Sequence, residues 1–418
     1  MPLFRRRYPP YPIRSALPLI RRKNPMEYRM KHQFGVEDEA FLQTMHALTG
    51  SPLQEGNSVE ILKNGVGTFP TMLAAIRAAR RSITMETYIY WDGEVARVFA
   101  EALAERCRAG VDVKLILDAV GSARMSRSLI DFLVKNGVQV LWYHPLRWYT
   151  LSRINHRTHR KLLIVDGSVG FTGGFGIADE WSGDADSPDH WRETNVRIEG
   201  PAVTQMQVAF MDNWIKAGGL IPTGLDWFPK VEPAGSVPAQ VIKSSPAEGV
   251  STVKLFYGLA LTSARQRVSI SNAYFIPDAD AVRALEGAAR RGVEVRVIVP
   301  GRWSDVPIVR QASRMHYDRL LRRGVRVFEY QPTMMHAKTM IVDGLWTTIG
   351  SSNFDARSFR LNDEVNVGIY GRTVAAEMEA MFEDDLARST EIRLGAWRRR
   401  SWFARAKESA ADFLKPQL

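Results

Sequence analysis

Apolar residues along this chain form short runs rich in β-branched side chains, and these runs alternate with stretches of helical periodicity. In the first half, a helical pattern from about Phe69 leads to an expected strand at 83–90, then to a helix and a second strand at 110–118. In the second half, strands expected at 268–276 and 292–300 also enclose a helix. Apolar strands separated by helices are typical of buried, largely parallel sheets with helices on both faces. The pattern therefore predicts an α/β fold.

The order of these elements occurs twice. Each half continues through another helix to a Gly-Val-x-Val strand, at 137–140 and at 324–327, and a proline-rich stretch separates the halves. A long internal repeat indicates two similar structural units. We therefore predict two similar α/β/α sandwich halves with mostly parallel sheets, related by a pseudo-two-fold axis. The expected parts are a basic N-terminal arm and lead-in at 1–56, a first domain at 57–220, a linker at 221–238, a second domain at 239–390, and a basic amphipathic C-terminal helix at 391–418.

Composition and charge narrow the class of protein. Of the 418 residues, 45% are hydrophobic and 24% are charged, as in globular proteins with sizeable cores. The formal net charge is +11, with nine Lys and Arg against one acid in residues 1–31 and eight against three in residues 388–418, so residues 32–387 sum to −2. Basic ends suit an anionic membrane surface, where each Lys or Arg adds about 1 kcal/mol of attraction. Solvated tails are the alternative.

The sequence predicts a peripheral membrane protein. No run reaches the roughly 18 to 20 apolar residues of a spanning helix, and Arg and Pro interrupt the first residues too often for a signal peptide. We expect the protein at the cytoplasmic face of the inner membrane. Near the end of the chain, apolar residues share one helical face among basic residues, which favours an interfacial helix over packing on the protein: Trp402, Phe403, Ala406, Ala410, Phe413 and Leu414. The single cysteine, Cys107, excludes an internal disulfide and is expected to be structural.

A duplicated motif carries the candidate chemistry. Both copies have the form His-x-Lys-x4-Asp, and matched positions are offset by 177 residues: His159, Lys161 and Asp166, then His336, Lys338 and Asp343. On a β-strand, side chains two residues apart point to the same face, so each His is expected to point the same way as its Lys. The Asp is at odd spacing from both, so it is expected to point elsewhere and to act as a structural or electrostatic support. Where the two strand ends meet, two imidazoles and two ammonium groups would surround one volume. A lone His is more often a core residue, but two complete motifs indicate a function.

The paired motifs resemble those of the phospholipase D superfamily, and the resemblance covers roughly residues 57–390. Three stretches, Phe171–Trp181, Trp191–Ala202 and Asn353–Glu364, resemble the bacterial cardiolipin synthase branch in particular. The N-terminus resembles that of the members that lack transmembrane helices. The resemblance implies two phospholipase D-like domains and an enzyme that transfers a phosphatidyl group from one phosphatidylglycerol to another, releases glycerol and forms cardiolipin.

The resemblance also implies roles for single residues. The two motif lysines would hold the anionic phosphodiester, and Ser351 and Asn353 would donate hydrogen bonds to its phosphoryl oxygens. The equivalent positions of the first motif are Gly174 and Gly176, so the usual first-half Asn is missing. That departure leaves the phosphate site asymmetric, because only the second motif supplies these hydrogen-bond donors.

By the same resemblance, one histidine attacks phosphorus to form a phosphatidyl-histidine, and the other protonates the leaving alcohol and then activates the incoming one. We assign His159 as the nucleophile and His336 as the acid and base, although the sequence makes them nearly interchangeable. Glu193 and Glu364 would accept the far ring N–H of each imidazole, or be ordinary surface acids. No metal or other cofactor is expected, because lysines and hydrogen-bond donors take the place of a Lewis acid.

Other functions remain open at this point. In a hydrolytic phospholipase D, water would resolve the intermediate, and only solvent access separates this reading from transfer. A nuclease of the same superfamily is disfavoured by the near-neutral body, so the expected partner is an anionic phospholipid membrane and not a nucleic acid. A scaffold that inherited the fold is disfavoured by the two intact motifs. Tyr88 and Tyr274, at matching places after the opening strands, would line the pocket or pack beside it.

Overall fold

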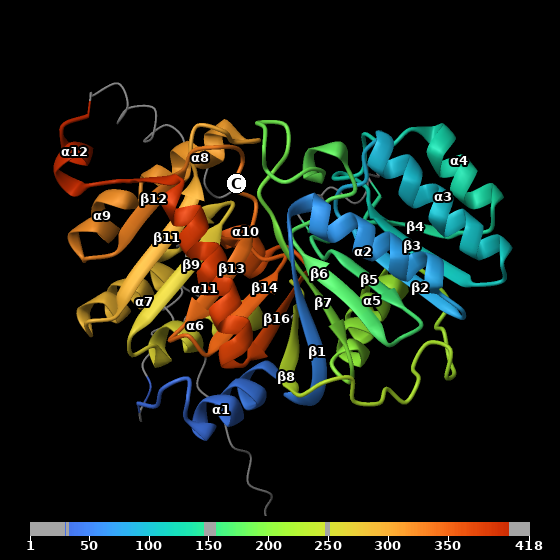
Figure 1. Ribbon diagram of the computed structural model, residues 1–418, viewed down its shortest axis with the longest axis horizontal. Coiled ribbons are helices and arrows are strands. Elements are labelled where there is room, and N and C mark those ends of the chain that lie inside the picture. The colour runs from blue at the N-terminus through green and yellow to red at the C-terminus, as the bar shows by residue number, and fades with distance from the viewer. Residues whose placement is uncertain (1–29, 31–32, 146–155, 247–250, 401–418) are drawn as a thin grey trace, which may run out of the picture.

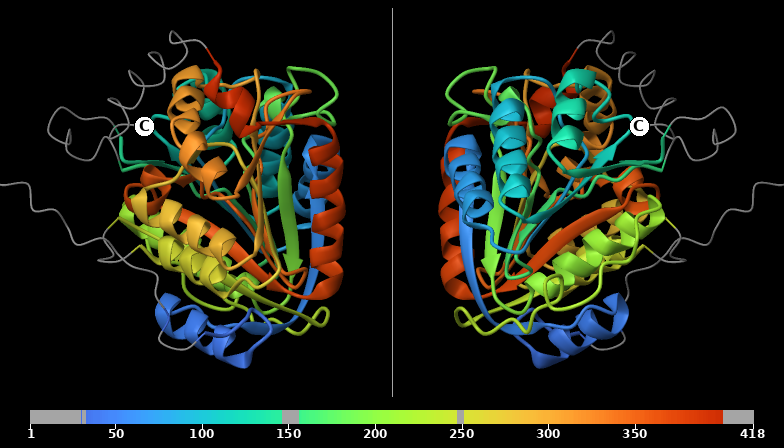
Figure 2. Two further views of the ribbon diagram at one scale, coloured as in Figure 1. Left: turned by 90° about the vertical axis from the view of Figure 1, so that its left-hand side faces the viewer. Right: turned by 90° about the vertical axis from the view of Figure 1, so that its right-hand side faces the viewer.

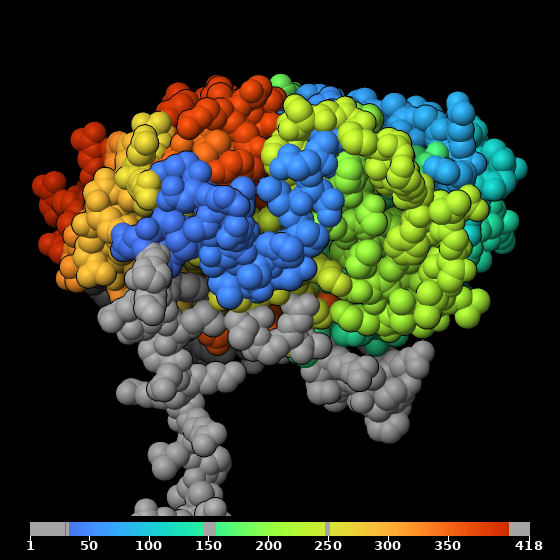
Figure 3. Space-filling view, turned by 90° about the horizontal axis from the view of Figure 1, so that it is seen from below, coloured from blue at the N-terminus to red at the C-terminus, as the bar shows by residue number. Residues whose placement is uncertain are grey.

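The computed structural model describes residue 30 and residues 33–145, 156–246 and 251–400. Most of the expected N-terminal arm, and the apolar face expected at 402–414, lie outside these residues. A helix within the expected lead-in, α1 (Glu39–Thr49), packs on the second half through an edge-to-face contact of Phe41 with Trp346 at 6.2 Å. Figure 3 shows this blue segment on the underside of the molecule.

The described elements follow the expected alternation of strand and helix. The first half comprises β1 (Gln54–Lys63), α2 (Asn64–Ala78), β2 (Ser82–Thr87), α3 (Glu94–Arg108), β3 (Asp112–Asp118), α4 (Arg127–Lys135), β4 (Gln139–Tyr143), β5 (Leu162–Val165), β6 (Val169–Gly173), the 3-10 helix η2 (Asp179–Trp181), β7 (Thr194–Glu199) and α5 (Val203–Lys216). The second half comprises β8 (Val237–Ser244), α6 (Thr252–Ser263), β9 (Arg267–Asn272), β10 (Phe275–Ile276), α7 (Ala279–Arg290), β11 (Glu294–Pro300), α8 (Pro307–Arg314), α9 (Tyr317–Arg322), β12 (Arg326–Tyr330), β13 (Lys338–Val342), β14 (Trp346–Gly350), β15 (Phe354–Asp355), α10 (Ala356–Arg360), β16 (Glu364–Tyr370), α11 (Arg372–Ala387), β17 (Ser389–Glu391) and α12 (Leu394–Arg398).

One sheet runs through both halves. Its strand order is β17-β12-β11-β9-β13-β14-β16-β8-β1-β7-β6-β5-β2-β3-β4, so the two halves repeat one order outward from the central pair β1 and β8. Helices α2 and α11 cover one face of this sheet, and α5 and α6 cover the other (Figure 2). One hydrophobic cluster takes buried residues from both halves, among them Ile198, Val241 and Val367. The prediction of two similar α/β halves about a pseudo-two-fold axis is confirmed.

The predicted strand directions are wrong. Parallel pairing within the large sheet is confined to β2-β3-β4 and β9-β11-β12, and the other described strand pairs of this sheet are antiparallel. A separate two-stranded sheet pairs β10 with β15 in parallel. The motif strands cause most of the difference, because β5 and β6 are joined by residues 166–168 alone and β13 and β14 by residues 343–345 alone. A parallel connection needs a dozen or more residues, whereas such short turns allow only hairpins.

The two motif aspartates lie in these hairpin turns. Asp166 and Asp343 adopt left-handed backbone angles, with φ of +51° and +52°. The carboxylate of Asp343 accepts backbone N–H groups of residues 265, 266 and 267 at 2.8 Å each, and that of Asp166 accepts the N–H groups of residues 80, 81 and 82 at 2.7 to 3.2 Å. Each aspartate therefore ties its turn to the start of the neighbouring strand.

Replacing Asp343 by Ala should lower the free energy of unfolding by about 2 kcal/mol, because three backbone donors lose their acceptor. Folded Asp343→Ala enzyme should keep its turnover number, since the carboxylate binds backbone groups at the strand start and no motif imidazole. Chemical denaturation and kinetics on the same samples measure both. Asp343→Asn is the control, because Asn tolerates the left-handed angle and keeps one acceptor oxygen. An unchanged unfolding midpoint with lost turnover would contradict this structural role.

Candidate active site

The two motif histidines precede the strands β5 and β13, close to the middle of the sheet. The backbone N–H of His159 donates to the carbonyl of Asp363 at 2.9 Å, and that of His336 donates to the carbonyl of Arg192 at 2.8 Å. Both bonds join the two halves, because each histidine belongs to one half and its acceptor to the other. His159 and His336 are 8% and 5% exposed, so this junction forms a nearly closed centre.

Each imidazole is held by a carboxylate from the opposite half. Nδ1 of His159 lies 3.0 and 3.1 Å from the two carboxylate oxygens of Glu364, and Nδ1 of His336 lies 2.6 Å from Oε2 of Glu193. Glu364 opens β16, and Glu193 directly precedes β7. Neither half therefore contains a complete His–Glu pair, and folding of both halves together assembles the two pairs.

Further hydrogen bonds fix the two carboxylates. Glu364 accepts the hydroxyl of Ser351 at 2.5 Å, and Glu193 accepts the indole N–H of Trp181 at 3.3 Å and the backbone N–H of Thr194 at 2.9 Å. Burial by itself would raise the pKa of each glutamate, but the charges and hydrogen bonds around it prevail and lower the pKa below its ordinary value. Both are therefore carboxylates that keep the proton of each imidazole on Nδ1 and leave Nε2 as the basic nitrogen.

The two lysines are buried beside the histidines. The ammonium of Lys161 donates to the carbonyl of His159 at 2.9 Å and lies 5.4 Å from the ring centre of Tyr88. That of Lys338 donates to the carbonyl of His336 and lies 2.9 and 3.1 Å from the Nδ1 and Nε2 atoms of the same residue. Burial lowers the pKa of Lys161 to about 7 and that of Lys338 to about 8. Two desolvated cations beside two imidazoles form a strong site for an anion.

Burial also keeps both imidazoles neutral. It lowers the pKa of His159 to about 4, against the opposing charge of Glu364. It lowers the pKa of His336 too, with the help of the Lys338 ammonium. A neutral imidazole has a free electron pair on Nε2, which is what a nucleophile or a general base requires.

The structure explains why the first motif lacks the second motif's polar residues. A Cβ atom at Gly174 would collide with the carboxylate of Glu193, and one at Gly176 would lie 3.0 Å from the ring of Trp181. In the second half, Asn353 has room, and its buried Oδ1 has no hydrogen-bond partner among the described residues. The hydroxyl of Ser351, expected to face the phosphate, donates to Glu364 instead.

The surroundings of the two histidines differ more than the motifs suggest. Behind His159, the buried Glu86 accepts hydrogen bonds from Thr158 and, at 2.7 Å, from Asn213, and burial raises the pKa of this glutamate to about 7. Behind His336, the residue that matches Thr158 at the 177-residue offset is Met335. Alignment of the stretch before each motif would have revealed this polar and apolar contrast.

The prediction that Tyr88 and Tyr274 match is wrong. Counted from the paired strands, Tyr88 corresponds to Ala273 and Tyr274 is one residue further along. The Tyr88 ring lies 5.3 Å from the His159 ring, whereas the Tyr274 hydroxyl donates to Asp305.

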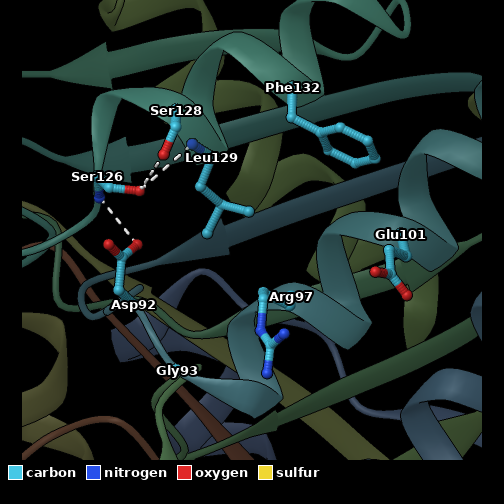
Figure 4. A pocket seen from close by; sticks show the side chains of 8 residues that line it. All are labelled: Asp92, Gly93, Arg97, Glu101, Ser126, Ser128, Leu129 and Phe132. Atoms are coloured by element: carbon cyan, nitrogen blue, oxygen red, sulfur yellow. Dashed lines mark hydrogen bonds between the residues drawn. The ribbon is translucent and has the colours of Figure 1, made fainter.

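A pocket of about 470 Å³ lies between α3 and α4, and none of its lining residues belongs to the motifs (Figure 4): Asp92, Gly93, Arg97, Glu101, Ser126, Ser128, Leu129 and Phe132. Among the residues that the structure describes, no group of three or more His, Cys, Asp or Glu side chains is placed to hold a metal ion. No helix in the described ranges is both long and apolar enough to cross a membrane.

Comparison with known proteins agrees with this geometry. A family described as the cardiolipin synthase, phospholipase D-like domain matches residues 72–214 and 259–386. The chain is 35% identical over 392 residues to a cardiolipin synthase of Halalkalibacterium halodurans, covering 92% of this chain and 77% of that protein. It is 37% identical over 357 residues to cardiolipin synthase A of Pseudomonas putida strain GB-1, covering 85% and 74%. The phosphatidylserine synthase structure from Haemophilus influenzae matches at a TM-score of 0.70 and 12% identity, over 91% of this chain and all of that one, and shares the fold.

Proposed function

This chain belongs to the cardiolipin synthase family of phospholipase D-like proteins, and from that premise we propose that it transfers a phosphatidyl group between two phosphatidylglycerol molecules through a phosphatidyl-histidine. The observation that supports the mechanism is that each half supplies the glutamate that binds the motif histidine of the other half. The two glutamates hold both neutral imidazoles by Nδ1, so that Nε2 is the basic nitrogen of each, in one nearly closed centre beside two ammonium groups.

In the first step, Nε2 of one histidine attacks the phosphorus of the donor, and the bond from phosphorus to the glycerol oxygen breaks. The second imidazole takes up a proton at Nε2 from the neighbouring Lys338 ammonium and gives it to that oxygen. Lys161, Lys338 and the amide of Asn353 hold the phosphoryl oxygens, where negative charge develops. In the second step, the hydroxyl of another phosphatidylglycerol attacks phosphorus, its proton passes to the second imidazole, and the bond from phosphorus to nitrogen breaks. Cardiolipin and glycerol are the products.

The structure favours His159 as the nucleophile. Lys161 donates to a backbone carbonyl and not to the His159 ring, so Nε2 of His159 keeps its electron pair for phosphorus. Lys338 lies 3.1 Å from Nε2 of His336 and competes for that electron pair. The same ammonium is placed to exchange charge with a protonated His336 as the proton moves, which suits the acid and base.

Mass spectrometry of lipids tests the proposal. Purified protein incubated with phosphatidylglycerol vesicles should release glycerol and form cardiolipin, and the variants His159→Ala and His336→Ala should form neither. Phosphatidic acid alone from the wild type would indicate a hydrolase instead. Loss of labelled DNA in the wild type but not in His159→Ala, with unchanged lipids, would indicate a nuclease.

We also propose that the protein binds the anionic cytoplasmic face of the membrane. Positive charge is concentrated in two ranges, residues 286–329 within the near-neutral body and residues 391–400 within the basic C-terminal segment. Together they contain fourteen Arg, no Lys and six acids, a formal charge of +8. Helices α9 and α12, which come from these ranges, lie together with the end of α7 at one end of the molecule (Figure 1). Arginine suits phosphate because its guanidinium donates two parallel hydrogen bonds.

Removing three exposed arginines from this end, Arg322, Arg323 and Arg399, as Gln variants should weaken binding to phosphatidylglycerol vesicles about 100-fold, at about 1 kcal/mol each. The defect should shrink as salt screens the charges. Co-sedimentation at several salt concentrations measures it. The matched control removes Arg77, Arg108 and Arg127, which are exposed on the first half. Equal weakening by both triple variants would contradict a localised surface.

A further inference from the structure

Two indole rings form a wall beside the His336 ring, whereas a single phenol ring lies beside the His159 ring. The ring of Trp181 lies edge-on at 5.1 Å from the His336 ring and that of Trp191 lies at 5.3 Å, with the two indoles 4.2 Å apart. The corresponding wall at His159 is the single phenol ring of Tyr88. Trp181 is buried, whereas Trp191 is partly exposed and forms the outer part of the wall.

This wall is held from several sides. The Trp181 indole N–H donates to Glu193, the carboxylate that orients His336. The absence of a side chain at Gly176 makes room for the Trp181 ring. The backbone N–H of Trp191 donates to the carbonyl of Glu180 at 2.8 Å. The wall is therefore part of the same assembly that positions the imidazole.

On the basis of the proposed function, we propose that Trp181 and Trp191 make the second step select an alcohol over water, with Trp191 as the specificity-determining residue. Either acceptor would attack phosphorus, give its proton to Nε2 of His336 and release His159, and water would yield phosphatidic acid. An indole face offers few hydrogen bonds to a water molecule beside the base, whereas the C–H groups of a glycerol head group pack on it. The preference for transfer over hydrolysis therefore arises beside His336, the base that activates the acceptor.

The partition of products tests this inference. On phosphatidylglycerol vesicles, Trp191→Ala should raise the ratio of phosphatidic acid to cardiolipin at least about tenfold, whereas Trp191→Phe, which keeps an apolar ring, should change it less than about threefold. The ratio is set by active molecules only, so a misfolded fraction does not alter it. In water enriched in oxygen-18, the added phosphatidic acid should carry the label.

Tyr88→Ala is the matched control, because it truncates an aromatic ring at the same 5.3 Å distance from the other histidine. It should lower the rate of both products and leave their ratio within about threefold of the wild type. An unchanged ratio in Trp191→Ala would overturn the inference while leaving cardiolipin synthesis intact. A wild type that forms no cardiolipin would instead refute the proposed function.

Discussion

His159→Ala and His336→Ala should both lose at least about 10⁴-fold in cardiolipin synthesis, as expected when a member of a catalytic pair is removed, yet they should fail at different steps. A phosphatidyl ester of p-nitrophenol separates them, because p-nitrophenolate leaves without a proton. His336→Ala retains the nucleophile and should release one equivalent of p-nitrophenol per enzyme and then stop, since no base activates the acceptor. His159→Ala should show no such burst.

Stopped-flow absorbance records the burst, and intact-protein mass spectrometry of the quenched His336→Ala enzyme should show the phosphatidyl adduct. Adding back imidazole provides a second control, because a free base should restart the stalled intermediate in His336→Ala. A burst from His159→Ala with none from His336→Ala would reverse the assigned roles. Equal bursts from both variants would contradict a single nucleophile.

The difference between the histidines arises from residues outside the motifs. His159 stands in front of a buried polar network around Glu86, whereas His336 stands beside two indole rings. A duplicated fold begins with two equivalent imidazoles, so the two chemical roles must be distinguished by their surroundings. A polar environment tolerates the charge that a phosphorylated imidazole brings, and an apolar one suits a group that must exchange a proton away from bulk water.

Much of the fold could be predicted because the repeat lies in local patterns. Strands expected at 110–118 and 292–300 are observed as β3 and β11, within two residues at their starts, because β-branched apolar runs are hard to place elsewhere in an α/β protein. The strand directions could not be predicted in the same way. The direction of a strand depends on the length of the connection that precedes it. The motif spacing does not reveal that Asp166 and Asp343 lie in hairpin turns.

The candidate site, like the fold, could be predicted from the sequence only in part. Motif spacing was enough to propose the six motif residues, since these residue types carry the chemistry, and the family resemblance added the two glutamates. It could not say which glutamate serves which histidine, because the pairing crosses from one half to the other over 205 and 143 residues. Nor could it predict that the Ser351 hydroxyl donates to Glu364, because this hydrogen bond depends on distances between strands. The first is a property of the two packed halves, and the second depends on the pairing of β14 with β16 within the second half.

Glu364→Gln should reduce kcat/KM about 10³- to 10⁴-fold, because a neutral amide can keep the proton of His159 on Nδ1 but cannot stabilise the positive charge that the ring acquires on attack. The pH dependence should shift as well. The Glu364 charge raises the pKa of both His159 and Lys161, so its removal lowers both.

In the wild type, activity should rise as His159 loses its proton near pH 4 and fall between about pH 7 and 8 as the two lysine ammonium groups lose theirs. In Glu364→Gln the falling limb should therefore move to lower pH, since Lys161 deprotonates earlier. Profiles of kcat/KM measured from pH 3.5 to 9 record this shift, with roughly half-unit steps resolving it. Glu193→Gln is the matched comparison, because it acts on His336 and Lys338 in the same way. A slower Glu364→Gln enzyme with an unshifted falling limb would mean that Glu364 orients His159 without setting the charge of the phosphate site.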